Sequence, residues 1–238
     1  MTQPPPVDPF GHPVAPPPPP YPAPTAWAQP QVHRVPRRLG GPATAAIVAA
    51  GALTLLGVLE AGFAWSAQAE YLEAAREGRP GFTVLTTYDL LAVAWLPALV
   101  ACFVTTGLWL HRARTNVEAL HPHLSHARSA GWAWGGWVVP FVSLWFPYQV
   151  VRDVSRDPAS GRSSPLIGWW WAAWLVFVVS DAFAASLVGY GAPDPTTLQA
   201  LGAAETWSAA TAVVGFTLWV LVVRDVTARH RRLLEGRI

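Results

Sequence analysis

The sequence contains no lysine and few charged residues of any kind. All sixteen basic side chains are arginine, and charged residues make up 13% of the chain, whereas a soluble domain carries about 25%. The formal net charge of +2 is too small to indicate a nucleic-acid partner. Because 52% of the residues are hydrophobic, the shortage of charge favours a protein of the lipid bilayer.

Cysteine and the common catalytic motifs are scarce as well. Cys102 is the only cysteine and lies in an apolar run, which excludes an intrachain disulfide and a thiolate metal cluster. We interpret it as a small buried hydrophobic residue. The chain has no nucleophile elbow, phosphate-binding loop, zinc-protease helix or dinucleotide fingerprint. We therefore expect no enzymatic activity, no cofactor and no bound metal.

The chain begins with a proline-rich arm over residues 1–41. Proline removes backbone donors and fixes φ, so we expect this arm to be disordered, extended and without a core. Its simplest role is that of a flexible spacer in the cytoplasm. The alternative is a docking strip for a cytoplasmic protein, with Tyr21 and Trp27 as anchors.

Residues 42–238 form the predicted membrane domain, which contains four long apolar runs. A helix rises about 1.5 Å per residue, so about 20 residues cross a hydrocarbon core of about 30 Å. The first run is rich in small side chains such as Ala46 and Ala50, which permit close helix packing. We expect the polar residues 68–87 to form an exposed loop. The predicted spans are residues 43–67, 90–110, 166–190 and 207–223.

A further apolar stretch, residues 131–150, combines four tryptophans with Pro140 and Pro147. If this stretch does not cross the membrane and the N-terminus is cytoplasmic, fourteen arginines lie inside and two outside. If it crosses, six lie inside and ten outside. Positive residues favour the cytoplasmic side, and proline disfavours a regular helix. We therefore predict a non-spanning Trp/Pro-rich element, either re-entrant or interfacial, with both termini in the cytoplasm.

The fold class predicted from these observations is an all-α integral membrane protein. It has four transmembrane helices in addition to the non-spanning element, and we expect a multi-pass protein of the plasma membrane.

Two segments of the chain read LWLHRARTNVEAL and GWAWGGWVVPFVSLWFPYQVVRDV. They resemble a family of actinobacterial multi-span membrane proteins that is known only as a domain of unknown function, number 4328. The resemblance covers roughly residues 43–235 and implies a membrane location without an activity. Phe146 departs from the family pattern, which leads us to expect a basic residue before the proline. The matching positions are Arg112, Arg114, Asn116, Gly131, Trp132, Val139, Pro140, Phe141, Leu144, Trp145, Pro147, Tyr148 and Gln149.

Two carboxylates lie deep inside predicted spans. Glu60 is seventeen residues into the first run, and Asp181 lies sixteen residues beyond Pro165. Both are therefore about 25 Å from the cytoplasmic side by helical rise. An ionised carboxylate in hydrocarbon costs several kcal/mol, so each should face the bundle, a partner group or water. The pair could form a site for a cation or proton, or each could be a neutral carboxyl near the interface.

The histidines of the second connection are a weaker candidate. His121, His123 and His126 could offer imidazoles to a metal, but Pro122 interrupts regular geometry and Glu118 is the only nearby carboxylate. We interpret these histidines as part of a solvated loop.

Three functional classes remain open. We favour a non-enzymatic scaffold, or a bundle that binds lipid or a partner protein. The alternative is a small transporter or channel component that uses Glu60 and Asp181. The third class, an intramembrane enzyme, lacks a recognisable catalytic set.

Overall fold

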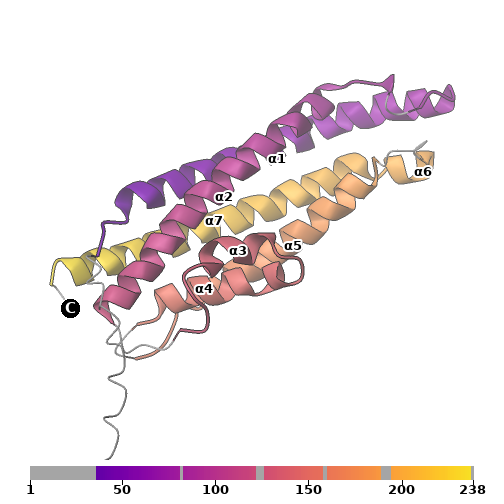
Figure 1. Ribbon diagram of the computed structural model, residues 1–238. Helices are drawn as coiled ribbons and strands as arrows, with labels where there is room; N and C mark the ends of the chain where they lie inside the picture. The colour runs from indigo at the N-terminus through magenta and orange to yellow at the C-terminus, as the bar shows by residue number, and fades with distance from the viewer. Residues whose placement is uncertain (1–35, 81–82, 122–125, 158–159, 189–193, 237–238) are drawn as a thin grey trace, which may run out of the picture. The chain divides into compact units, whose positions relative to one another are not determined.

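The computed structural model describes residues 36–80, 83–121, 126–157, 160–188 and 194–236, so the proline-rich part of the arm lies outside the described residues. Within these ranges every regular element is a helix. Four of them are long and apolar enough to cross a membrane, which confirms the predicted all-α class. They are α1 (Gly40–Arg76), α2 (Thr87–Leu120), α5 (Leu166–Ser186) and α7 (Leu201–Leu234) (Figure 1).

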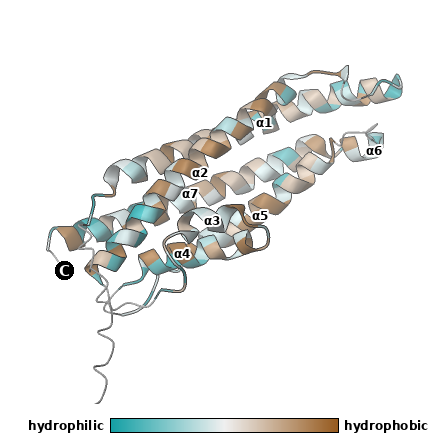
Figure 2. Cartoon of the chain, viewed as in Figure 1, coloured by the Kyte–Doolittle hydropathy of each residue, from teal (hydrophilic) through white to brown (hydrophobic). Residues whose placement is uncertain are grey.

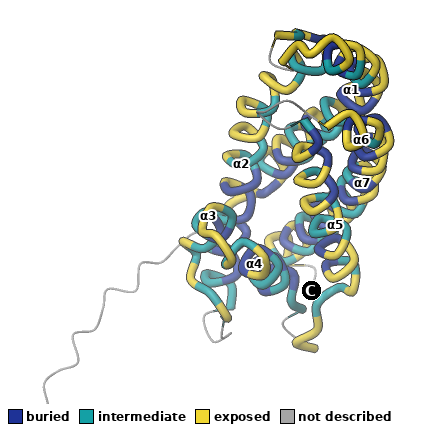
Figure 3. Tube along the Cα trace, turned by 90° about the vertical axis from the view of Figure 1, so that its right-hand side faces the viewer, coloured by how far each residue is buried: buried dark blue, intermediate teal, exposed yellow. Residues whose placement is uncertain are grey.

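The long helices pack in the order α2, α1, α7, α5. Helix α1 contacts both α2 and α7, and α5 packs on α7. Helices α2 and α5 are not packed against each other, and the short helix α4 (Phe146–Ser155) bridges them by contacting both (Figure 3). The short helices α3 (Trp132–Val138) and α4 form a hairpin. We call the end of the bundle where α1 begins and α7 ends the hairpin end.

Side-chain size selects the buried face of α1. Hydrophilic residues gather toward the ends of the helices (Figure 2), and apolar side chains such as Val48 and Leu55 are exposed along α1. Most of its buried positions are separated by three, four or seven residues, as one helix face requires, and most are alanine. Small side chains let neighbouring backbones approach closely. The positions on this face are Ala43, Ala46, Leu53, Glu60, Ala64, Ala67, Tyr71 and Ala74.

The first connection is shorter than predicted. We expected an exposed loop over residues 68–87, but α1 continues into this region as far as Arg76. Tyr71 is buried and donates its hydroxyl to Asp89 Oδ1 on α2 at 2.7 Å. Asp89 also forms a capping box with Thr86 at the start of α2. The prediction was wrong because the buried face of α1 has partners beyond the span.

The other helix ends also differ from the predicted spans. Helices α2 and α7 run past residues 110 and 223, and α5 ends at Ser186 rather than at 190. Part of the remaining connection forms the short helix α6 (Pro195–Leu198). Hydropathy marks the lipid-contacting part of a helix, whereas packing against neighbours determines where the helix stops.

Residues 131–150 belong to a helical hairpin that is too short to cross the membrane. Helix α3 (Trp132–Val138) has seven residues and α4 has ten, which correspond to about 10 and about 15 Å. Between them lie Pro140, a 3-10 turn, η2 (Val142–Leu144), and Phe141 with φ of 61°. The predicted non-spanning element therefore turns at Pro140 and Phe141.

Candidate functional site

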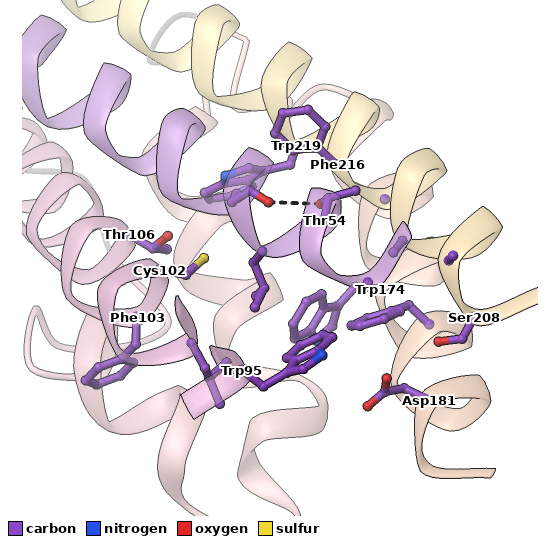
Figure 4. Close-up of a pocket in the computed structure, with 18 of the residues that line it drawn as sticks. Thr54, Trp95, Cys102, Phe103, Thr106, Trp174, Asp181, Ser208, Phe216 and Trp219 are labelled. Atoms are coloured by element: carbon purple, nitrogen blue, oxygen red, sulfur yellow. Dashed lines mark hydrogen bonds between the residues drawn. The ribbon is translucent and has the colours of Figure 1, made fainter. Parts of the chain in front are cut away.

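A cavity of about 460 Å³ lies inside the bundle. Its walls come from α1, α2, α5 and α7, and α3 contributes residues near the hairpin end. The walls are mainly apolar, and five of the lining residues are tryptophans. These are Trp95, Trp137, Trp170, Trp174 and Trp219, of which Figure 4 labels Trp95, Trp174 and Trp219.

Three carboxylates lie together at the end of the cavity that is farthest from the hairpin end. Helices α1 and α5 run away from the hairpin end, and Glu60 and Asp181 are the last lining residues on them. Helix α7 runs in the opposite direction, and Glu205 is its first lining residue. The cavity therefore has an acidic end and an apolar remainder.

Helix α2 holds two of these carboxylates through aromatic donors. Trp95 donates its indole Nε1 to Glu60 Oε2. Tyr88 donates its hydroxyl to Glu205 Oε1 at 2.7 Å. Ser208 of α7 lies beside Asp181 (Figure 4). These contacts tie α2 to both α1 and α7 at the acidic end.

The structure thus brings both predicted carboxylates to one cavity and adds a third. Glu205 was missed because the sequence placed it in the connection before the last span. Its signal is the helical spacing of Leu201, Glu205 and Ser208, which continues through Gly215 and Trp219 along one buried face of α7. Glu60 and Glu205 are only 6% and 8% exposed.

The acidic end has no counter-charge from the protein among the residues that line the cavity. Lysine, arginine and histidine are all missing from the described part of its wall. Throughout the described ranges, no group of three His, Cys, Asp or Glu residues could hold a metal ion. His121 and His126 belong to no such group, and His123 lies outside the described residues.

Two positions of the family motif, Arg114 and Asn116, are buried near the end of α2. Arg114 is 3% exposed and donates Nη2 to the carbonyl of Arg128 at 2.8 Å. Its Nη1 lies 3.3 Å from Glu118 Oε1. Asn116 Oδ1 accepts from the amide of Arg37 at 2.8 Å, and its Nδ2 donates to the carbonyl of that residue at 2.7 Å. These contacts fix the segments that precede α1 and α3 against α2.

Arg128 connects this cluster to the hairpin. Its Nε donates to Gln149 Oε1 at 2.8 Å, and its guanidinium lies 3.8 Å from the centroid of the Phe146 ring. Such a cation–π contact is attractive and strengthens when the pair is desolvated. Phe146 also packs edge-on against Trp132 at 4.5 Å. Phe146, where a basic residue was expected, therefore supplies the ring for a nearby arginine.

The other motif positions also belong to the hairpin end. Gly131 caps the start of α3, Pro147 lies in the first turn of α4, and the Tyr148 ring lies 6.5 Å from that of Trp171. Arg112 is half-buried, whereas Pro140 and Trp145 are exposed. No motif position lies among the described residues of the cavity wall. The motif thus builds the hairpin end, and the cavity is a separate feature.

Four apolar helices, a short helical hairpin and an internal cavity define a polytopic helical membrane bundle. The chain belongs to the family described as a domain of unknown function, DUF4328, whose model matches residues 83–231. Neither the curated proteins nor the solved structures give a match. The family description gives no activity.

Proposed function

We propose that this chain is a non-enzymatic membrane bundle that binds an amphiphilic molecule from the surrounding bilayer. The observation that supports this function is the cavity of about 460 Å³ with one polar end. Sites for small molecules commonly measure about 300–1,000 Å³ and have apolar walls with a few convergent polar groups. An amphiphile has the matching division into an apolar body and a polar head.

Access from lipid is supported by the arrangement of the helices. Leu99 and Val100 of α2 line the cavity and are 46% and 50% exposed, so this wall reaches the outer surface. Helix α5 also lines the cavity, and it is not packed against α2. A bilayer molecule can therefore enter between α2 and α5 without leaving the hydrocarbon.

The test is to identify what the protein carries out of its native membrane. We expect mass spectrometry of the purified full chain to find a bound amphiphile. Ala212→Phe places a ring in the cavity wall, so it should reduce the bound amount at least about fivefold. Ala172→Phe is the matched control on the exposed face of α5 and should retain the ligand. Equal retention by both variants would contradict binding in this cavity.

A transporter or channel component is the second candidate, which the carboxylates at membrane depth favour. A carrier would move a cation or proton through liposomes that contain the purified chain. Glu60→Gln and Asp181→Asn would abolish this flux, whereas Glu70→Gln on the exposed face of α1 would leave it unchanged. Ligand binding without flux would assign the chain to the binding class.

The orientation and the arm complete the proposal. We place both termini in the cytoplasm of a plasma membrane, because this arrangement puts fourteen of the arginines inside. The proline-rich arm would dock a cytoplasmic protein. Deleting residues 1–35 should therefore remove partner binding and leave the amphiphile bound.

A further inference from the structure

The chemistry of the acidic end restricts which amphiphile can bind. We infer that the ligand is an amphiphilic organic cation, whose charged head lies among Glu60, Asp181 and Glu205 and whose apolar part lies among the tryptophans. This inference rests on the proposed function, because it names the ligand class of the same cavity.

The first observation is that the two buried glutamates keep an oxygen for a ligand. Glu60 uses Oε2 for Trp95, and Glu205 uses Oε1 for Tyr88. Each of these bonds uses one carboxylate oxygen, and the second oxygen, Glu60 Oε1 or Glu205 Oε2, is the one that a ligand would contact. Both side chains are more than nine-tenths buried, and no basic residue is found in the described wall of the cavity. A buried carboxylate requires hydrogen bonds or an opposite charge, which a cationic head supplies.

The second observation is that the rest of the cavity suits an organic cation better than a metal ion. The three carboxylates do not form a group that could hold a metal, according to the geometry of the described residues. Indole rings are the aromatic surfaces that attract organic cations most strongly, and Trp95 and Trp174 flank the acidic end (Figure 4). A head group larger than a metal ion can contact several of these groups at once.

A third observation concerns Trp137, whose ring packs edge-on against that of Trp174 at 6.0 Å. The indole Nε1 of Trp137 is buried without a hydrogen-bond partner, although this residue lines the cavity. A buried donor requires an acceptor, which a ligand ester or amide oxygen would provide. The ligand class is therefore a cation with an apolar body, and an acceptor along that body would satisfy Trp137.

The experiment compares three decyl compounds that differ only in their heads. The full chain is placed in phosphatidylcholine nanodiscs, and its thermal unfolding midpoint is measured with decyltrimethylammonium, decyl sulfate and decyl maltoside. Only the cation should raise the midpoint in a saturable manner. The double variant Glu60→Gln/Glu205→Gln should weaken its affinity by about tenfold or more, because the attraction of two carboxylates for the positive head is lost. Glu70→Gln should bind as the unmodified chain does.

The outcomes separate the two proposals. Saturable stabilisation by all three compounds would overturn the cationic ligand and retain the amphiphile site. No saturable effect of any compound, together with no amphiphile in the purified chain, would overturn both. If the double variant does not fold, the comparison of the three heads on the unmodified chain still decides, because it requires no substitution.

Discussion

Small residues determine where the helices of this bundle approach each other. Ala46, Ala64 and Ala67 have no exposed surface, whereas Val48 and Leu55 of the same helix are 64% and 59% exposed. In lipid an apolar side chain gains little from moving into the protein, because acyl chains are equally apolar. Close packing of small side chains therefore decides which face of a helix turns inward.

Gly107 offers a test of this principle. A Cβ at this position would collide with the indole ring of Trp134, which belongs to α3. We expect Gly107→Ala to destabilise the fold by about 1–3 kcal/mol, measured as a lower unfolding midpoint in detergent. Gly62→Ala is the control, because nothing lies within 4 Å of its Cβ and alanine favours a helix. Equal unfolding midpoints for the two variants would show that the Trp134 ring moves aside without loss of stability.

Residue patterns predicted two of the three cavity carboxylates. Glu60 and Asp181 stand out because each interrupts a long apolar run. Glu205 follows a polar connection, so its position in a helix depends on where α7 begins. Trp95 and Tyr88 lie far in the sequence from the glutamates that they contact, so no sequence pattern indicates either contact. A sequence pattern thus finds acids in spans, whereas side-chain partners on other helices require the fold.

The hairpin of α3 and α4 is held by contacts with the segment that precedes it and with α5. Arg128 is central, since it bonds Gln149 and lies over Phe146. Trp171 of α5 also donates its Nε1 to the carbonyl of Leu144 at 3.0 Å. The hairpin is therefore attached on two sides, and its own helices are too short to be stable alone.

Removing the arginine contacts should loosen the hairpin. We expect Arg128→Met to accelerate hydrogen exchange in residues 132–155 and to cost about 1–3 kcal/mol of stability, because a charged hydrogen bond and a cation–π contact are lost. Exchange in α7 should stay unchanged. Arg162→Met, at an exposed position, is the matched control. Faster exchange throughout the bundle would instead make Arg128 essential to the whole fold.

The segment before α3 should also respond to pH. Burial and, next, the positive charge of Arg114 lower the pKa of His126 below its ordinary value of about 6.5. Its Nε2 is buried without a partner. The unfolded chain therefore binds a proton at a higher pH than the folded chain, so His126 lowers stability as pH falls below about 6.5.

This dependence can be measured by comparison with a variant. Between about pH 7.5 and about pH 5.5 the unfolding midpoint of His126→Gln should fall less than that of the unmodified chain. His12→Gln, in the arm, is the control and should follow the unmodified chain. Identical pH profiles for all three proteins would exclude His126 as the titrating group.

The sequence predicted the hairpin more accurately than the helix lengths. Pro140 and Pro147 oppose a regular helix, and the arginine distribution opposes a fifth crossing, so two independent signals agreed. The continuation of α1 depends on Tyr71 meeting Asp89, a contact between helices that hydropathy does not record. Polar residues beyond a span were therefore assigned to a loop although they continue the helix.

For the whole molecule, the orientation is the main prediction. In a Cys102→Ala background, single cysteines at Ser129 and Ser160 lie on exposed positions that flank the hairpin, and Glu77 lies at the opposite end of α1. We expect a membrane-impermeant thiol reagent to label Glu77→Cys in intact cells. Ser129→Cys and Ser160→Cys should react only after the cytoplasmic face is opened. Reaction of these two from opposite sides would mean that the hairpin crosses the membrane.

The packing order of the helices has a consequence for assembly. Helices α1 and α2 are neighbours in the sequence and in space, and α5 and α7 pack together with only the short α6 between them in the sequence. The seam between α1 and α7 joins residues far apart in the chain. Each pair can therefore form as it enters the bilayer, and we expect the seam to close last. Glu60 and Glu205 lie on opposite sides of that seam, so the cavity does not exist in either half alone. A ligand that binds only the closed bundle would favour closure, and we expect newly made chains to mature faster in its presence.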